Sequence, residues 1–129
     1  MELCDTLMME AIGKFGNVSM PLPDRDSIFF KFQGPTPNSI QDSAAIVDEI
    51  AKKYGGSGLT FAKDDEESEE LWRARKAAHW SAMALVEGGT CYSTDVCVPV
   101  SNLPRLVKET KQDLKENGIV GPILGCVAS

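Results

Sequence analysis

Residues 64–87 read DDEESEELWRARKAAHWSAMALVE, and this stretch decides most of the fold. Its second part has apolar residues at helical spacing, and its acidic beginning suits the positive end of a helix dipole. Gly88-Gly89 then supplies a stop signal. We therefore predict one long helix over 64–87, with the acidic run as its solvated first turns.

A cation lies within the apolar stripe of this predicted helix. At 100° per residue, Arg75 falls among the apolar side chains of one face. These side chains are Leu71, Ala78, Ala82, Leu85 and Val86. A guanidinium is costly to bury without a partner, so three interpretations stay open. Arg75 forms an internal ion pair, for instance with Asp95, or binds a ligand carboxylate, or reaches solvent at the rim of the core.

His79 lies beside Arg75 on the predicted helix and is the only histidine of the chain. A metal site made of two histidines therefore cannot be built from this chain alone. His79 is either a packed neutral side chain or a neighbour of a substrate. Trp80 projects from the opposite side of the helix, where it is either a docking residue or a single exposed aromatic.

The rest of the chain alternates between strand and helix patterns. The predicted segments, in chain order, are a helix over 2–15, a strand over 27–34, a helix beginning near Ser39 and ending before Gly55-Gly56, a short strand over 57–63, the helix 64–87, a strand over 91–98 that ends at Pro99, a helix from Ser101 to Asn117-Gly118, and a strand over 119–127. The order is a helix followed by βαβαβαβ. Such alternation is typical of layered α/β and α+β folds.

Composition and charge narrow the function classes. The chain has 129 residues, the length of one domain, and a net charge of −6 without a basic cluster. Nucleic acid is therefore not expected as a partner. No apolar run approaches the roughly 20 residues that a transmembrane helix needs, and the first residues do not have the pattern of a targeting segment.

The sequence also contains no phosphate loop, dinucleotide-binding glycine motif, nucleophile elbow or HExxH zinc motif. The four cysteines match no metal or redox spacing, and we expect them as thiols in the core.

Three segments carry a family resemblance: ELWRARKAAHWSAMAL, GGTCYSTDVCVPVSNLPRLVKETKQDL and VGPILGCV. The chain resembles the C-terminal substrate (cap) domain of FAD-linked D-2-hydroxyacid dehydrogenases, most closely the mitochondrial, cytochrome-linked D-lactate dehydrogenases. The resemblance implies an α+β fold with a ferredoxin-like antiparallel sheet covered by helices. It also implies that a separate N-terminal domain binds most of the FAD, that D-lactate gives a hydride to the flavin, and that the electrons pass to cytochrome c or another acceptor.

The same resemblance assigns residues to the substrate. The arginine that clamps the substrate carboxylate in the family corresponds to Arg75, and His79, Ser93 and Asp95 are expected as substrate-side neighbours. The family continues after its last strand with GHxGDGNxH, whose histidines hold a divalent metal. Here that strand reads GCVAS, so Cys126 takes the place of the first histidine.

We therefore expect residues 1–129 to be part of a cap domain whose sheet is incomplete at the C-terminus, with the FAD-binding domain and the metal ligands absent and the chain inactive by itself. The alternative is a free-standing α+β domain that binds carboxylates or regulates another protein without redox activity.

Overall fold

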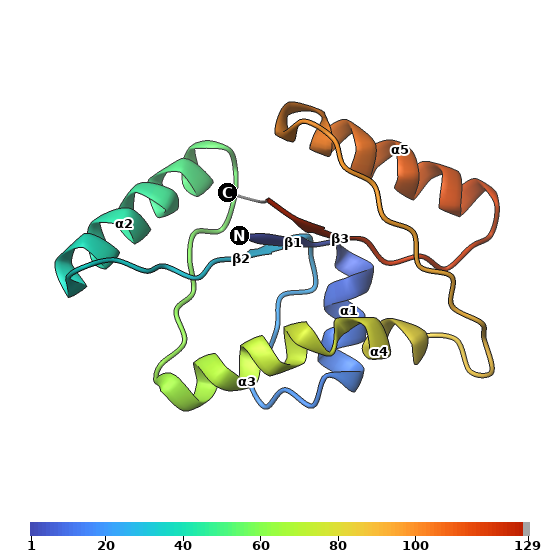
Figure 1. The fold of residues 1–129 in the computed structure, drawn as a ribbon, viewed down its shortest axis with the longest axis horizontal. Helices are drawn as coiled ribbons and strands as arrows, with labels where there is room; N and C mark the ends of the chain where they lie inside the picture. The colour runs from blue at the N-terminus through green and yellow to red at the C-terminus, as the bar shows by residue number, and fades with distance from the viewer. Residues whose placement is uncertain (128–129) are drawn as a thin grey trace.

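The central strand of the sheet is formed by the first residues of the chain. In the computed structural model, which describes residues 1–127, β1 (Glu2–Cys4) pairs antiparallel with β2 (Ser27–Phe29) and with β3 (Leu124–Cys126), in the order β2-β1-β3. Figure 1 shows the three strands at the centre of the molecule. The sheet therefore joins the two ends of the described chain.

The register of the strands decides which side chains share a face of the sheet. Glu2 lies opposite Phe29 on one neighbour and opposite Cys126 on the other. Because side chains alternate along a strand, Glu2 and Cys4 point to one face and Leu3 points to the opposite face. Cys4 and Phe29 belong to the core, so the Glu2 side chain lies on the core-facing side of the sheet.

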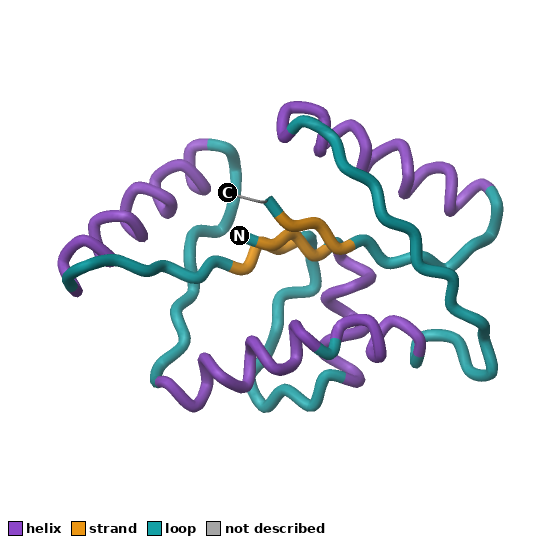
Figure 2. The backbone as a smooth tube through the Cα atoms, in the orientation of Figure 1, coloured by secondary structure: helices purple, strands orange, loops and turns teal. Residues whose placement is uncertain are grey.

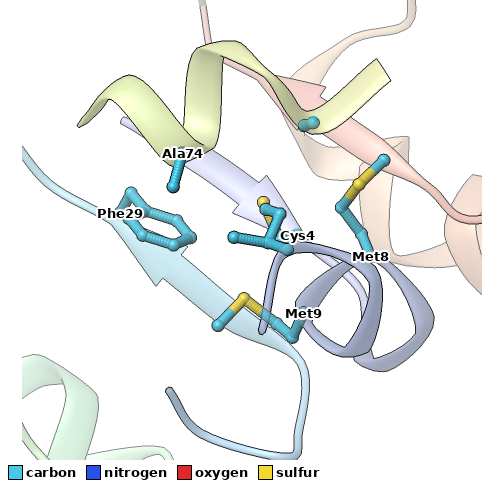
Figure 3. Packing of buried hydrophobic residues seen from close by; sticks show 7 residues of the cluster. Cys4, Met8, Met9, Phe29 and Ala74 are labelled. Atoms are coloured by element: carbon cyan, nitrogen blue, oxygen red, sulfur yellow. The ribbon is translucent and has the colours of Figure 1, made fainter. Parts of the chain in front are cut away.

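Three helices cover that core-facing side: α1 (Thr6–Phe15), α3 (Asp65–Lys76) and α4 (Ala78–Met83). Figure 1 places them together on one side of the strands. Their buried side chains meet Cys4 and Phe29 in a single cluster, drawn in Figure 3. The cluster consists of Cys4, Met8, Met9, Ile12, Phe29, Ala74 and Ala78, with Leu71 and Trp72 packed against it. The small side chain of Ala78 allows α4 to approach α1 closely.

The other side of the sheet carries α2 (Pro37–Lys53) and α5 (Leu103–Glu116), the latter preceded by the 3-10 turn η1 (Val100–Asn102). Leu103 of α5 reaches this face, because a Cβ on Gly125 would lie 3.9 Å from its Cδ1 atom. In α2 only Ala44 is buried, while Ile46 and Ile50 are more than half exposed. The apolar residues of α2 are therefore largely open to solvent.

Side-chain caps determine where the helices begin. Asp5 accepts a hydrogen bond from the Met8 backbone N–H at the start of α1, and Asp64 accepts one from Glu67 at the start of α3. In α2, Thr36 and Ser39 form a reciprocal capping box. Helix α2 therefore begins at Pro37, and Ser39 lies in its first turn instead of at its start.

The α+β class is confirmed, but the predicted order of elements is not what residues 1–127 form. The predicted helix over 2–15 begins with strand β1, because residues 2–4 pair on both sides and Asp5 starts the helix. The segments 57–63 and 91–98 are loops, as Figure 2 shows, since no neighbouring strand pairs with them. The remaining strands exist but are short: β2 ends at Phe29, and β3 covers only Leu124–Cys126.

The predicted long helix over 64–87 is interrupted and shorter than expected. Ala77 has φ −83° and ψ 4°, far from the helical ψ of about −42°, and it separates α3 from α4. Helix α4 ends at Met83, before the predicted stop at Gly88-Gly89. The acidic run does begin a helix, with Asp65, Glu66 and Glu67 in the first turn of α3. The predicted end of α5 at Asn117-Gly118 is also confirmed, with Gly118 at φ 66°.

Candidate carboxylate-binding site

Arg75 lies in the last turn of α3 and is largely buried, with 15% of its side chain exposed. The adjacent Ala74 packs into the core, and this contact fixes the last turn of α3 beneath the sheet. The Arg75 Nε atom forms an ion pair with Oε2 of Glu2. The Glu2 side chain, 25% exposed, reaches α3 from the core-facing side of β1. A helix and the central strand thus both contribute to this site.

The contact between Arg75 and Glu2 is an ion pair without hydrogen-bond geometry. The two atoms are close, yet both Arg75 Nε and Glu2 Oε2 are buried and lack a properly directed hydrogen-bond partner among the described residues. The charge pairing is the stabilising feature, because a buried guanidinium would be far less stable without an adjacent carboxylate. Among residues 1–127, Glu2 is the acidic partner of Arg75, and its closest contact is at Nε, on the side of the guanidinium.

The predicted ion pair between Arg75 and Asp95 is not formed. Asp95 is exposed, in the loop that replaces the predicted strand over 91–98. That loop does not bring the carboxylate to α3, whereas the pairing of β1 with two neighbouring strands places Glu2 there. Of the three interpretations of Arg75, an internal ion pair is confirmed, but its partner is Glu2.

The other predicted site residues are not joined to Arg75. His79 is exposed on α4, and its ring packs edge-on against Trp80, with ring centroids 5.4 Å apart. Ser93 is exposed in the same loop as Asp95. Across residues 1–127, no hydrogen bond or ion pair connects His79, Ser93 or Asp95 with the guanidinium of Arg75. The prediction that Arg75 and His79 lie side by side assumes one continuous helix. The helix is interrupted at Ala77, so Arg75 lies on α3 and His79 on α4.

The thiol of Cys4 lies in the same region as the ion pair. Burial raises the pKa of Cys4 to about 11, with the positive charge of Arg75 opposing this shift and the charges of Glu2 and Asp5 adding to it. The thiol is therefore protonated at neutral pH and is not a nucleophile. Cys4 is the one cysteine in the core; Cys91, Cys97 and Cys126 are exposed thiols, contrary to the expectation that all four are core residues.

The sequence analysis missed a polar cluster around the start of α1. Buried Asp5 accepts hydrogen bonds from the backbone N–H groups of Met8 and Ile123, at 2.9 Å and 3.0 Å, and its second oxygen lies 3.6 Å from Lys111 Nζ. Asp26 accepts hydrogen bonds from the backbone and hydroxyl of Thr6, both at 2.7 Å, and from Lys111 at 3.0 Å. Asp5 directly before a helical pattern is a capping signal that the sequence does contain. No local signal indicates the contact with Lys111.

The two charged partners in this cluster have shifted pKa values. Hydrogen bonds, first from the Thr6 hydroxyl and then from Lys111, lower the pKa of Asp26. Partial burial by itself would lower the pKa of Lys111, but hydrogen bonding to Asp26 and the charges of Asp5 and Asp26 raise it overall. The cluster connects α1, α5 and the segments before β2 and β3, and it stabilises the scaffold that holds β1 in place.

The described residues do not supply a metal centre or a membrane span. Within residues 1–127, no group of three or more His, Cys, Asp or Glu side chains is arranged to hold a metal ion. Two surface hollows lie along α5 and between α1 and residues 20–24, and neither includes Arg75. None of the described helices is both long enough and apolar enough to cross a bilayer.

The family described as "FAD linked oxidases, C-terminal domain" matches residues 1–128, and the chain belongs to this family. The family resemblance noted from the sequence is thereby confirmed.

Three curated relatives are similar over nearly the whole chain. "Probable D-lactate dehydrogenase, mitochondrial" of Danio rerio is 41% identical over 126 residues, which are 98% of this chain and 25% of the relative. "D-lactate dehydrogenase [cytochrome] 1, mitochondrial" of Saccharomyces cerevisiae is 35% identical, over 97% of this chain and 22% of the relative. The Arabidopsis thaliana "D-lactate dehydrogenase [cytochrome], mitochondrial" is 32% identical, over 95% and 21%. The chain thus spans about a quarter of the length of these relatives.

Proposed function

We propose that this chain is the substrate-binding (cap) part of an FAD-dependent D-lactate dehydrogenase that oxidises D-lactate to pyruvate. The observation that carries the proposal is the arginine at the sheet: Arg75 is fixed on α3, and its closest contact with Glu2 is at Nε and not at its terminal amino groups. The family match over residues 1–128 and the names of the three relatives support the choice of substrate.

The proposed role of Arg75 is to bind the carboxylate of the 2-hydroxyacid. The parallel Nη1–H and Nη2–H groups match the two oxygens of a carboxylate, and hydrogen bonds between charged groups of this kind contribute roughly 1.5–3 kcal/mol. When the carboxylate is anchored, the neighbouring carbon atom of the substrate holds its hydrogen in one fixed direction. The role of this chain is therefore to bind and orient the substrate.

The register of the sheet supports this placement of the substrate. Cys126 occupies the position of the family's first histidine, and in β3 it lies directly opposite Glu2, the partner of Arg75. The sequence resemblance and the strand pairing thus point to the same end of the sheet. A thiol at this position does not reproduce the family's histidine pair, and the described residues do not fit a metal, so no step is assigned to a metal here.

His79, Ser93 and Asp95 remain proposed substrate-side neighbours of Arg75. All three are exposed in this chain. Because they are exposed, these side chains can contact a second domain of the enzyme. We propose that, when this domain covers the site, they contribute to the choice between lactate and longer 2-hydroxyacids. Their role therefore depends on the rest of the enzyme.

FAD is the proposed cofactor, and it accepts the hydride from the substrate when bound. The residues that hold it are proposed to lie in a separate FAD-binding domain, because the family resemblance implies that such a domain binds most of the flavin. The three strands, in the antiparallel order β2-β1-β3, support a ferredoxin-like sheet that further strands would extend. Taken by itself, the chain is proposed to be inactive.

Cytochrome c as electron acceptor and a mitochondrial location complete the proposal. The printed names of the yeast and Arabidopsis relatives include the word cytochrome, and the names of all three include the word mitochondrial. Oxidation of one D-lactate releases two electrons, so two molecules of a one-electron acceptor are reduced for each pyruvate formed.

The experiment that tests the proposal uses a chimera in which this chain replaces the matching 126 residues of the Danio rerio relative. We expect D-lactate-dependent reduction of a dye acceptor, and for Arg75→Lys a KM for D-lactate that is about tenfold higher, because an ammonium lacks the guanidinium fork. Arg73→Lys, on the exposed side of the same helix, is the matched control. A chimera with bound flavin and no turnover, or an unchanged KM in Arg75→Lys, would contradict the proposal.

A free-standing carboxylate-binding or regulatory domain is the second candidate function. A largely buried arginine beside the sheet favours it as well, because this feature requires no flavin. D-lactate and acetate titrated into the 129-residue chain distinguish the two candidates. Tight carboxylate binding by the chain alone, combined with an inactive chimera, would favour the regulatory candidate.

A further inference from the structure

The guanidinium of Arg75 has two edges at which a carboxylate can bind, and Glu2 lies against one of them. The side edge carries the Nε atom, which forms the ion pair with Glu2 without directed hydrogen-bond geometry. The end edge carries the Nη1 and Nη2 groups, whose parallel N–H groups form a fork that matches a carboxylate. The closest contact of Glu2 therefore lies away from this fork.

We infer that Glu2 is a positioning residue, which holds the side edge of Arg75 so that its end edge faces the substrate carboxylate. This inference rests on the proposed function and adds a residue to the same site. It follows from the placement of the pair: Glu2 belongs to the central strand, and both partner strands fix its backbone. A long arginine side chain that is already ordered loses less conformational entropy when a ligand binds.

A competing role for Glu2 makes the opposite prediction. Glu2 is itself a carboxylate, and an anion that occupied the end edge of Arg75 would have to leave before the substrate could bind. The contact at Nε argues against this role, because the closest approach of Glu2 is to the side edge of the guanidinium. A purely structural role, in which the pair only stabilises the fold, is the third possibility and predicts no change in substrate binding.

Two variants of Glu2 separate these roles in the chimera described above. Glu2→Ala removes the holder, whereas Glu2→Gln keeps the length of the side chain and an oxygen beside Nε and removes only the charge. If Glu2 positions Arg75, Glu2→Ala raises the KM for D-lactate about three- to tenfold with kcat nearly unchanged, and Glu2→Gln restores it to within about twofold of the wild-type value. If Glu2 competes with the substrate, both variants lower the KM. If the pair is only structural, the melting temperature falls and the KM stays constant.

The matched control for these variants is Glu10→Ala. Glu10 also pairs with a cation, Lys14, but this pair lies on the exposed surface of α1. We expect its KM to stay within about twofold of the wild-type value, since exposed pairs of this kind contribute little. A comparable rise in KM for Glu10→Ala would mean that the effect of Glu2→Ala is not specific to Arg75.

A second readout needs no substrate and uses the 129-residue chain itself. In nitrogen-15 NMR spectra, the Nε–H signal of Arg75 should exchange slowly with solvent in the wild type and in Glu2→Gln, because the Nε atom is buried, and rapidly in Glu2→Ala. Rapid exchange in the wild type would overturn the inference while leaving the proposed function intact. An unchanged KM in Arg75→Lys would instead contradict the proposed function. If the chimera binds no flavin, titration of the chain with D-lactate, followed at the Arg75 signals, provides the affinity ratios.

Discussion

At the scale of single residues, two acidic side chains organise the molecule, the buried Asp5 and the partly buried Glu2. Glu2 pairs with Arg75, and Asp5 satisfies backbone N–H groups at the start of α1 and before β3. Both belong to the first five residues of the chain, and both depend on partners that are distant in sequence. Buried carboxylates of this type are retained only where their oxygens have partners, because an unpaired buried charge is strongly destabilising.

We predict that Asp5→Ala lowers the free energy of unfolding by about 3 kcal/mol, because it removes the helix cap and leaves the Ile123 N–H without a partner. Urea denaturation of the 129-residue chain provides the measurement. Asp64→Ala, which removes the exposed cap of α3, serves as the control and should cost only about 1 kcal/mol. Equal losses in the two variants would show that the contacts of Asp5 beyond its cap contribute nothing.

At the scale of elements, hydrogen bonds between segments compensate for a small sheet. The strands have only three residues each, and such short pairings are weak without support from neighbouring elements. Lys111 of α5 contacts Asp5 and Asp26, and Ser19 donates its hydroxyl to Glu70 of α3 at 2.8 Å. These contacts hold helices from both sides of the sheet around β1.

The contact between Asp26 and Lys111 predicts a defined dependence of stability on pH. The folded state lowers the pKa of Asp26 below its ordinary 3.8, so its stabilising effect is present above this pH and is lost as the pH falls through the folded value. The folded state raises the pKa of Lys111 above 10.5, so its contribution is complete below that pH and is lost only at more alkaline pH. The pair is therefore fully effective between these two limits.

Asp26→Asn should consequently be less stable than the wild type by a constant amount between pH 5 and 9, an interval within the limits set by the two pKa directions. Below pH 3.8 the difference should shrink, because the wild-type carboxylate becomes protonated. Urea midpoints measured across this range test the prediction. Asp24→Asn is the control, since Asp24 is 95% exposed. A difference that stays constant down to pH 2 would exclude the role assigned to Asp26.

At the scale of the whole molecule, many large apolar side chains remain exposed. Ile28 on β2 is 49% exposed and Leu124 on β3 is 40% exposed, and both strands are edges of the sheet. Tyr92 and Val96, in the loop that was predicted as a strand, are 89% and 65% exposed. Contiguous apolar surface and open strand edges are typical of surfaces that other polypeptide covers.

We predict that the 129-residue chain self-associates when it is produced alone, because its edge strands β2 and β3 can pair with other copies. Leu124→Lys should increase the monomer fraction in sedimentation experiments, since a charge on an edge strand opposes such pairing. Val120→Lys adds the same charge in a loop and should have a much smaller effect. A wild-type chain that is monomeric at high concentration would count against the proposal that it is part of a larger enzyme.

The elements that the sequence predicts correctly are those whose signals lie within a few neighbouring residues. The cores of α1, α2, α3 and α5 follow from helical spacing, and the ends of α1 and α5 follow from Gly16-Asn17 and Asn117-Gly118. Helix α3 was expected to continue to Gly88-Gly89, and nothing in the spacing marks the interruption at Ala77. Residues 91–98 have a good strand pattern, yet a strand also needs a neighbour, and the described residues provide none.

The sequence by itself determined the α+β class and the family, and it singled out Arg75, because a cation within an apolar helical stripe is costly to bury without a partner. The tertiary structure alone decided that this partner is Glu2 and not Asp95, and that residues 2–4 form the central strand instead of a first helical turn. The physical reason is the range of the interactions involved. Helices and their caps depend on residues within about four positions, which a sequence displays directly, whereas strand pairing and buried ion pairs join residues whose separation along the chain is large and carries no local signal.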